Sequence, residues 1–313
     1  MSKDIVVGTR ASRLAQWQAH WVVNNLKKFF PKHKFIVVEV KTQGDKNSNI
    51  ALTQFGTKGV FTKELETAIL ERRIDFAVHS MKDLPTRLPD GLTIGAICER
   101  SDPADVLISR QGLSLEELPL NARIGTSSLR RRAQLKHFRS DLQIENLRGN
   151  LNTRMAKLKK QNLDGIVLAA AGIERLGWGN RITQRVPYSI SLPAVGQGAI
   201  GIEIRENDRE ILEIVKVLEH APSAITISAE RSFLRTLEGG CQIPIGAIAT
   251  LEGKALVLEG MVGNLNGVKI LRAKLDGTAD QAEQIGIYLA NKLLNMGADK
   301  ILNELKLRFN RYE

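Results

Sequence analysis

The residue with the clearest capacity for covalent chemistry is a cysteine on a predicted tight turn. Cys241 lies in the segment LEGGCQIPIGA, residues 237–247, where glycine and proline predict a turn that leaves the thiol accessible. An accessible thiol can react with a ligand or carry one covalently. By composition alone, a spare surface cysteine is the simpler explanation, so the interpretation depends on the residues found elsewhere.

Several arginines lie at or just after the points where a predicted strand meets a predicted helix. They are Arg10, Arg130, Arg131, Arg148 and Arg154. Acidic partners are scarce nearby, because residues 124–156 contain only two acidic residues. An exposed arginine–carboxylate pair contributes about 0–1 kcal/mol, whereas a desolvated bidentate pair contributes roughly 1.5–3 kcal/mol. We therefore expect these guanidinium groups, with the hydroxyls of Ser12, Thr126 and Ser128, to hold a chain of carboxylates. A nucleic-acid patch is the alternative.

A carboxylate placed after a buried strand is the candidate for acid chemistry. Asp83, in DFAVHSMKDLP, lies next to Lys82 and before a Leu-Pro break. In a positive cleft, such a carboxylate can stabilise a cation that develops on a ligand. A helix cap or a surface pair with Lys82 would also explain it. His79, within the apolar strand, is best explained as a core residue with a hydrogen-bond partner.

The elements around these residues repeat. Residues 5–16, IVVGTRASRLAQ, and residues 122–134, ARIGTSSLRRRAQ, each predict a strand, a Gly-Thr pair and a helix. A second strand, an amphipathic helix and a buried strand follow in both cases, which indicates two parallel α/β lobes. Ligands of such lobes bind beyond the carboxyl ends of the strands, so we expect a cleft between them. Residues 45–59 occur in the first lobe alone and predict a lid or an idle surface loop.

The pattern predicts three domains. The first lobe would contain residues 1–98 and 198–217, the second 103–193, and a small α+β domain with Cys241 would contain 220–313. In this last domain we expect a helix over 223–237, three strands near 243–250, 254–263 and 267–275, and helices over 279–296 and 298–308.

Composition restricts the partners. The net charge is +11, so an acidic partner is expected, but aromatic residues make up only 5% of the chain, too few for a base-stacking surface. A small acidic ligand is therefore favoured over nucleic acid. The chain has two cysteines, no zinc-like Cys/His spacing, no P-loop, no secretory signal and no apolar run long enough for a membrane span. We expect a cytoplasmic protein with no bound metal. An anion-binding sensor would explain the cleft, but it would leave Cys241 and Asp83 without a role.

Six motifs occur in order over most of the chain: HSMKDLP, GTSSLRRRAQL, LRGN with NTR, AAAGIERLG, LPAVGQGAIGIE and LEGGCQIPIGA. In these motifs the chain closely resembles the porphobilinogen deaminase family. The resemblance implies a transferase of tetrapyrrole (haem) biosynthesis, which joins four porphobilinogen molecules head to tail into hydroxymethylbilane and releases ammonia. It also implies a dipyrromethane cofactor linked to Cys241 by a thioether. The implied fold is two lobes like type II periplasmic binding proteins, with an α+β third domain. A chain with three domains of its own could work alone, so we expect a monomer.

The resemblance also implies a role for individual residues. Asp83 would be catalytic. The cofactor acids would be bound by Lys82, Thr126, Ser128, Arg130 and Arg131. Substrate or the growing chain would be bound by Arg10, Ser12, Arg148, Arg154, Arg175 and Gln197. Lys58 would belong to the lid, where TQFGTKG departs from the family's more usual glycine pair.

Overall fold

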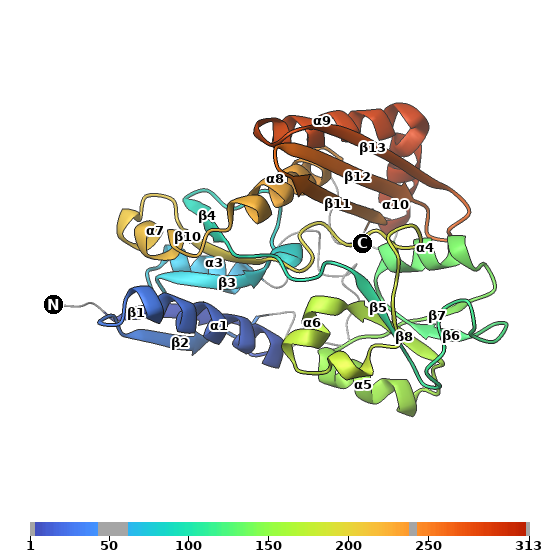
Figure 1. The fold of residues 1–313 in the computed structure, drawn as a ribbon, viewed down its shortest axis with the longest axis horizontal. Helices are drawn as coiled ribbons and strands as arrows, with labels where there is room; N and C mark the ends of the chain where they lie inside the picture. Colours follow the sequence, from blue (N-terminus) through green and yellow to red (C-terminus); the bar gives the residue numbers. More distant parts are fainter. Residues whose placement is uncertain (1–3, 43–61, 238–242, 311–313) are drawn as a thin grey trace. The chain divides into compact units, whose positions relative to one another are not determined.

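The computed structural model describes residues 4–42, 62–237 and 243–310 of the chain (Figure 1). These residues form three β-sheets with their associated helices. Among them, no helix is both long enough and apolar enough to cross a membrane.

Within the described residues, the chain passes between two compact units at three points. The first unit contains the residues before 102 together with 198–225, and the second contains 102–197 and the residues from 226 onward. The three domains expected from the sequence, with boundaries near 98–103, 193–198 and 217–220, stay a prediction.

The first unit contains a five-stranded mixed sheet in the order β2-β1-β3-β10-β4. Its parallel strands are β1 (Ile5–Thr9), β2 (Phe35–Glu39) and β3 (Phe76–Ser80). The later strand β10 (Ile200–Arg205) lies antiparallel between β3 and β4 (Leu92–Ile97). The residues that follow β1 and β3 therefore lie at the same edge of this sheet.

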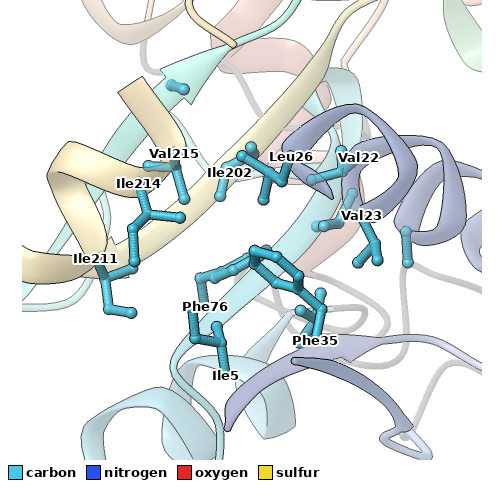
Figure 2. Close-up of a cluster of buried hydrophobic side chains, with 14 of the residues drawn as sticks. Ile5, Val22, Val23, Leu26, Phe35, Phe76, Ile202, Ile211, Ile214 and Val215 are labelled. Atoms are coloured by element: carbon cyan, nitrogen blue, oxygen red, sulfur yellow. The ribbon is translucent and has the colours of Figure 1, made fainter. Parts of the chain in front are cut away.

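A hydrophobic core holds this sheet against two helices (Figure 2). Helix α1 (Arg13–Phe29) contributes Leu26, and α7 (Arg209–Lys216) contributes Ile214. Both side chains point toward Phe76 of β3, which is fully buried. Burial of a side chain of this size contributes about 1.5–3 kcal/mol. The core thus fixes β3 and, through it, the residues that follow.

The sheet of the second unit has the corresponding order, β7-β6-β8-β5-β9. The strands β6 (Arg123–Gly125), β7 (Gln143–Glu145) and β8 (Gly165–Ala169) are parallel. Strand β5 (Asp105–Ser109) lies antiparallel between β8 and β9 (Gln184–Arg185). The predicted similarity of the two lobes is confirmed in strand order and direction. The expectation of parallel units is wrong for the fourth strand of each sheet, β10 or β5, which runs opposite to the other four.

Those antiparallel strands have a common origin in the path of the chain. Strand β5 enters the second sheet directly after β4 of the first, and β10 re-enters the first sheet after β9 of the second. No antiparallel neighbour in either sheet is consecutive in sequence. Alternating strands and helices in a sequence indicate βαβ units of consecutive elements. The antiparallel pairing of β10 and β5 with their neighbours could therefore not be predicted from this alternation.

The third sheet is an antiparallel meander of β11 (Ile245–Glu252), β12 (Ala255–Gly263) and β13 (Ile270–Thr278). Gly260 of β12 allows the close approach of a helix, because a Cβ atom there would lie 2.5 Å from the ring of Phe233. The expected α+β pattern is confirmed, with element ends shifted by a few residues. The helices are α8 (Ala221–Thr236), α9 (Ala282–Leu293) and α10 (Asp299–Asn310).

Candidate functional site

A pocket in the first unit brings together the predicted catalytic acid and two predicted substrate-binding residues. Asp83, Arg10 and Ser12 all contribute to its lining. Asp83 ends the short 3₁₀ helix η2 (Met81–Asp83), which follows β3, and Arg10 follows β1. The two strands are parallel neighbours, so the sheet itself places these residues at one edge. Lys82, half-buried, belongs to the same short helix.

The N-terminus of α1 forms part of this pocket. The Ser12 hydroxyl caps the helix by accepting a hydrogen bond from the backbone N–H of Ala15 at 3.3 Å. The first turn of α1 contains no acidic residue, so its partial positive charge is available to an anionic ligand. The pocket therefore combines a positive helix end and a guanidinium group with the carboxylate of Asp83. This set suits a ligand that carries acids and develops a positive charge.

A partly buried hydrogen bond joins the two elements that form the pocket. The Nε2 of Gln18, on α1, donates to the Ser80 hydroxyl, at the end of β3, at 2.9 Å. Gln18 is 2% exposed and also lines the pocket. Gln18 was not among the residues predicted from the sequence, because a glutamine on the buried face of an amphipathic helix has no distinctive spacing.

His79 is buried and hydrogen-bonded, as the sequence predicts, and it also contributes to the lining of the pocket. Its Nε2 lies 2.8 Å from Oε2 of Glu203 on β10, and the two side chains are 3% and 0% exposed. A second buried carboxyl group, that of Glu66 on α3 (Lys63–Leu70), lies close enough to interact with both. Burial raises the pKa of Glu66, and the charge of Glu203 raises it further.

In the second unit, the two arginines predicted to bind the cofactor share one buried carboxylate. Arg130 and Arg131 lie in the first turn of α4 (Leu129–Phe138). The Nη1 of Arg130 donates to Oδ2 of Asp105 at 2.6 Å, and the Nη2 of Arg131 donates to Oδ1 at 2.7 Å. Asp105 is completely buried, and both arginines are 5% exposed or less.

Electrostatics make this cluster a positive one. Burial alone would raise the pKa of Asp105, but the two adjacent guanidinium groups hold it well below the usual range. The two guanidinium groups and the one carboxylate give this buried cluster a formal charge of +1. The expectation that these arginines lack acidic partners is wrong, because the partner lies outside the stretch of sequence in which acids were counted.

Three further predicted cofactor or substrate residues surround this cluster. Gln197 is 1% exposed, donates from Nε2 to Asp105 Oδ1 at 2.9 Å, and accepts from Nη2 of Arg131 at 3.4 Å. The Ser128 hydroxyl caps α4 by accepting from the N–H of Arg131. The Thr126 hydroxyl accepts from the N–H of Ser128 at 3.2 Å. These three residues therefore lie with the two arginines at the start of α4.

Two of the other predicted substrate-binding arginines flank the start of one helix. Arg148 precedes α5 (Leu151–Lys160), and Arg154 lies within it, where its Nε donates to the carbonyl of Gly149 at 2.7 Å. Gly149 has a φ of 102°, a conformation that favours glycine and turns the chain into the helix. Arg175 ends the short helix α6 (Ala170–Arg175).

Two predicted residues cannot be placed. Cys241 and Lys58 lie outside the described residues, so the attachment point and the lid remain predictions. The residues around Asp83 belong to the first unit, and those around Asp105 belong to the second.

The donors around Asp105 fit an additional acidic ligand. The Nε–H of Arg130 makes no hydrogen bond to the described residues, and the net charge of the cluster is positive. Guanidinium groups held by a buried carboxylate are preorganised for bidentate binding of another. Among the described residues, no group of three or more His, Cys, Asp or Glu side chains is placed to hold a metal ion.

Comparison with known proteins gives consistent matches over almost the whole chain. Residues 5–213 match the family model "Porphobilinogen deaminase, dipyromethane cofactor binding domain", and residues 224–295 match "Porphobilinogen deaminase, C-terminal domain". A porphobilinogen deaminase of Pelotomaculum thermopropionicum is 54% identical over 98% of both chains. One from Gloeobacter violaceus is 51% identical over 97% of this chain and 94% of its own.

Solved structures match at a much lower level. An arginine-specific periplasmic binding protein of Salmonella typhimurium has a TM-score of 0.40 and 14% identity, and it covers 71% of this chain and 94% of its own. The VFT2 domain of Bordetella pertussis BvgS has a TM-score of 0.42 and 14% identity, with 74% and 91% covered.

Proposed function

We infer that this chain, which belongs to the porphobilinogen deaminase family, is the transferase that joins four porphobilinogen molecules into hydroxymethylbilane and releases ammonia at each step. The structural observation that best supports this function is the pocket in which Asp83 lies with Arg10 at the carboxyl ends of parallel strands. Porphobilinogen carries two carboxylates and becomes cationic when its amine leaves. A site for it therefore needs both signs of charge.

The family's dipyrromethane cofactor would be held in two ways. Cys241 would carry it through a thioether, and Arg130 and Arg131 would bind its carboxylates together with Lys82, Thr126 and Ser128. The buried +1 cluster around Asp105 supports this assignment, because a desolvated guanidinium pair favours a further acid. When bound, the cofactor supplies the pyrrole carbon to which the first substrate is joined.

The proposed role of Asp83 is electrostatic. Loss of ammonia from porphobilinogen leaves a positive charge on the pyrrole and its methylene carbon. An ionised carboxylate beside that charge stabilises the transition state more than the neutral ring that precedes it, and this difference accelerates the step. The half-buried position of Asp83 in the pocket limits solvent screening of the interaction.

The remaining residues would bind the acids of the substrate and the growing chain. Arg10 and Ser12 line the pocket with Asp83, which supports their assignment to the incoming substrate. Arg148, Arg154, Arg175 and Gln197 belong to the second unit and are proposed for the growing chain. We further propose that Lys58 acts in the lid, that one chain suffices, and that the protein works in the cytoplasm without nucleic acid.

The stoichiometry of the reaction tests the proposed function. Purified protein is incubated with porphobilinogen, and substrate, ammonia and linear tetrapyrrole are measured at intervals. We expect one ammonia per porphobilinogen consumed and one tetrapyrrole per four. Consumption without ammonia, or ammonia without an oligopyrrole product, would contradict this function.

Charge-removing substitutions at Arg148 and Arg154 are expected to stall elongation while cofactor attachment continues. The reason is that each added pyrrole brings two more carboxylates, which need further cationic partners. Intact mass spectrometry after a limited pulse of porphobilinogen should show Arg148→Gln and Arg154→Gln accumulating enzyme-bound intermediates. Lys160→Gln, at the opposite end of α5, is the control. Normal elongation by both arginine variants would remove their proposed role.

A further inference from the structure

The buried pair of His79 and Glu203 has no role in the chemistry of Asp83 and the arginines. His79 belongs to the pocket lining together with Asp83, and its ring is paired with Glu203. Burying two ionisable groups costs several kcal/mol per charge, and a well-packed apolar pair in their place is often equally stable. Buried ionisable groups next to a cleft are candidates for a functional role.

The sheet fixes the geometry of this pair. Strands β3 and β10 are antiparallel neighbours in which His79 faces Gly201 and Ala77 faces Glu203. The carboxylate is thereby placed diagonally next to the imidazole, on the side of the sheet where Glu66 of α3 also lies. Within the described part of the chain, the ring forms its hydrogen bond through Nε2 to Glu203. A carboxylate at Nε2 holds the proton there, so that Nδ1 is left as the basic nitrogen.

The proposed reaction needs a group that accepts a proton as well as a group that stabilises the cation. Porphobilinogen arrives with a protonated primary amine, and its nitrogen leaves as ammonia with the electrons of the C–N bond. The acceptor pyrrole then forms a C–C bond and must lose the hydrogen of the reacting carbon as a proton. Asp83 stabilises the cation only while it is ionised, so a second group that takes the proton keeps that stabilisation in place.

We propose that His79, held by Glu203, is the base that accepts this proton in each condensation. The inference rests on the proposed function. The C–H bond breaks, its electron pair restores the aromatic pyrrole, and the proton goes to Nδ1 of His79. The released ammonia then takes the proton and leaves as ammonium, which restores the neutral imidazole. Glu203 stabilises the imidazolium while it exists.

Several charged groups face His79 and would affect its titration. They are Glu203 on β10, Glu66 on α3, and Arg10 and Asp83 in the lining of the same pocket; Glu64 on α3 interacts with Glu66. Because the neutral imidazole is the active form, turnover should fall as the pH drops and His79 becomes protonated. Without the negative charge of Glu203 the imidazolium is less stable, so Glu203→Gln should move the acidic limb of the pH profile to lower pH.

The test compares pH profiles of turnover for the wild type and three variants. We expect His79→Gln to lower turnover at least about 100-fold and to lose the acidic limb, with a KM for porphobilinogen within about threefold of wild type. Glu203→Gln should keep the limb but shift it by at least about one pH unit to lower pH. His33→Gln, a histidine in the same unit that packs against Phe30, should keep the wild-type profile.

A second readout is independent of turnover. The protein is labelled with ¹⁵N-histidine, and the His79 signal, one of five, is assigned by its absence in His79→Gln. Its titration midpoint should match the acidic limb in the wild type and shift with it in Glu203→Gln. If His79→Gln fails to fold, the His79 signal is assigned by elimination, from single glutamine substitutions of the other four histidines. Its match to the acidic limb in the wild type and in Glu203→Gln then decides the question.

Three outcomes would overturn the inference. They are wild-type turnover by His79→Gln, an acidic limb that stays fixed in Glu203→Gln while the His79 midpoint moves, and a wild-type limb that does not match His79. A wild-type protein that makes no tetrapyrrole would overturn the proposed function, and with it this inference. A wild-type protein that makes tetrapyrrole with a limb unrelated to His79 would overturn the inference alone.

Discussion

Asp83→Asn is expected to lower turnover of porphobilinogen by about 1,000-fold while the fold is kept. The substitution preserves the shape of the side chain and removes the negative charge that faces the developing cation. Opposite charges about 4 Å apart at an effective dielectric constant of about 20 interact by about 4 kcal/mol, which is roughly a thousandfold in rate. The measurement is the rate of ammonia release under substrate saturation.

A matched control separates the charge effect from a general effect of the substitution. Asp90 is an exposed aspartate in the same unit, seven residues along the chain, and Asp90→Asn should retain the wild-type rate. Both variants should unfold at the wild-type temperature. Ammonia release within about tenfold of wild type by Asp83→Asn would show that another group stabilises the cation.

The second large effect is a loss of folding stability, expected for Asp105→Asn. Asp105→Asn leaves two buried guanidinium groups without their shared charge, and breaking a buried ion pair by removing one partner costs about 3–5 kcal/mol. Urea unfolding followed by circular dichroism measures this loss. Asp276→Asn, at an exposed position of β13, is the control and should leave the midpoint unchanged.

The same carboxylate predicts a dependence of stability on pH. The folded-state pKa of Asp105 is lowered by Arg130 and Arg131, so its contribution is complete above the unfolded pKa, about 3.9. The contribution is lost as the pH falls below that value. In Asp105→Asn this part of the acid sensitivity should be absent. Equal acid sensitivity of the two proteins, together with an unchanged urea midpoint, would show that the cluster contributes nothing to folding.

Local patterns were sufficient to predict much of the architecture. The Gly-Thr pair between a strand and a helix occurs at Thr9 and again at Thr126, and the two sheets built after these points share order and direction. Asp83 and Arg10 could be expected at one edge because both follow strands of one parallel unit. Both features, the strand order and the shared edge, follow from elements that are consecutive in the sequence, and such elements can be predicted from local patterns.

Contacts between distant parts of the chain could not be predicted in the same way. Asp105 precedes Arg130 by 25 residues, and Glu203 follows His79 by 124. Each of these two side-chain pairs depends on a strand that lies in its sheet beside strands from distant parts of the chain. The spacing of residues in the sequence therefore does not predict the contact. Residues 198–217, which include β10, were predicted to belong to the first lobe, but the antiparallel direction of β5 and β10, the strands that carry these two carboxylates, was not predicted.

The central claim is that the protein builds its product on pyrroles tethered to Cys241, and the mass of the purified protein tests it most directly. Wild-type protein from cells that make porphobilinogen should exceed the mass of its 34.7 kDa chain by two linked pyrrole units and react with Ehrlich's reagent. Cys241→Ser should have the mass of the bare chain and no colour. A wild-type mass equal to the bare polypeptide, or a pyrrole excess that survives in Cys241→Ser, would contradict the account.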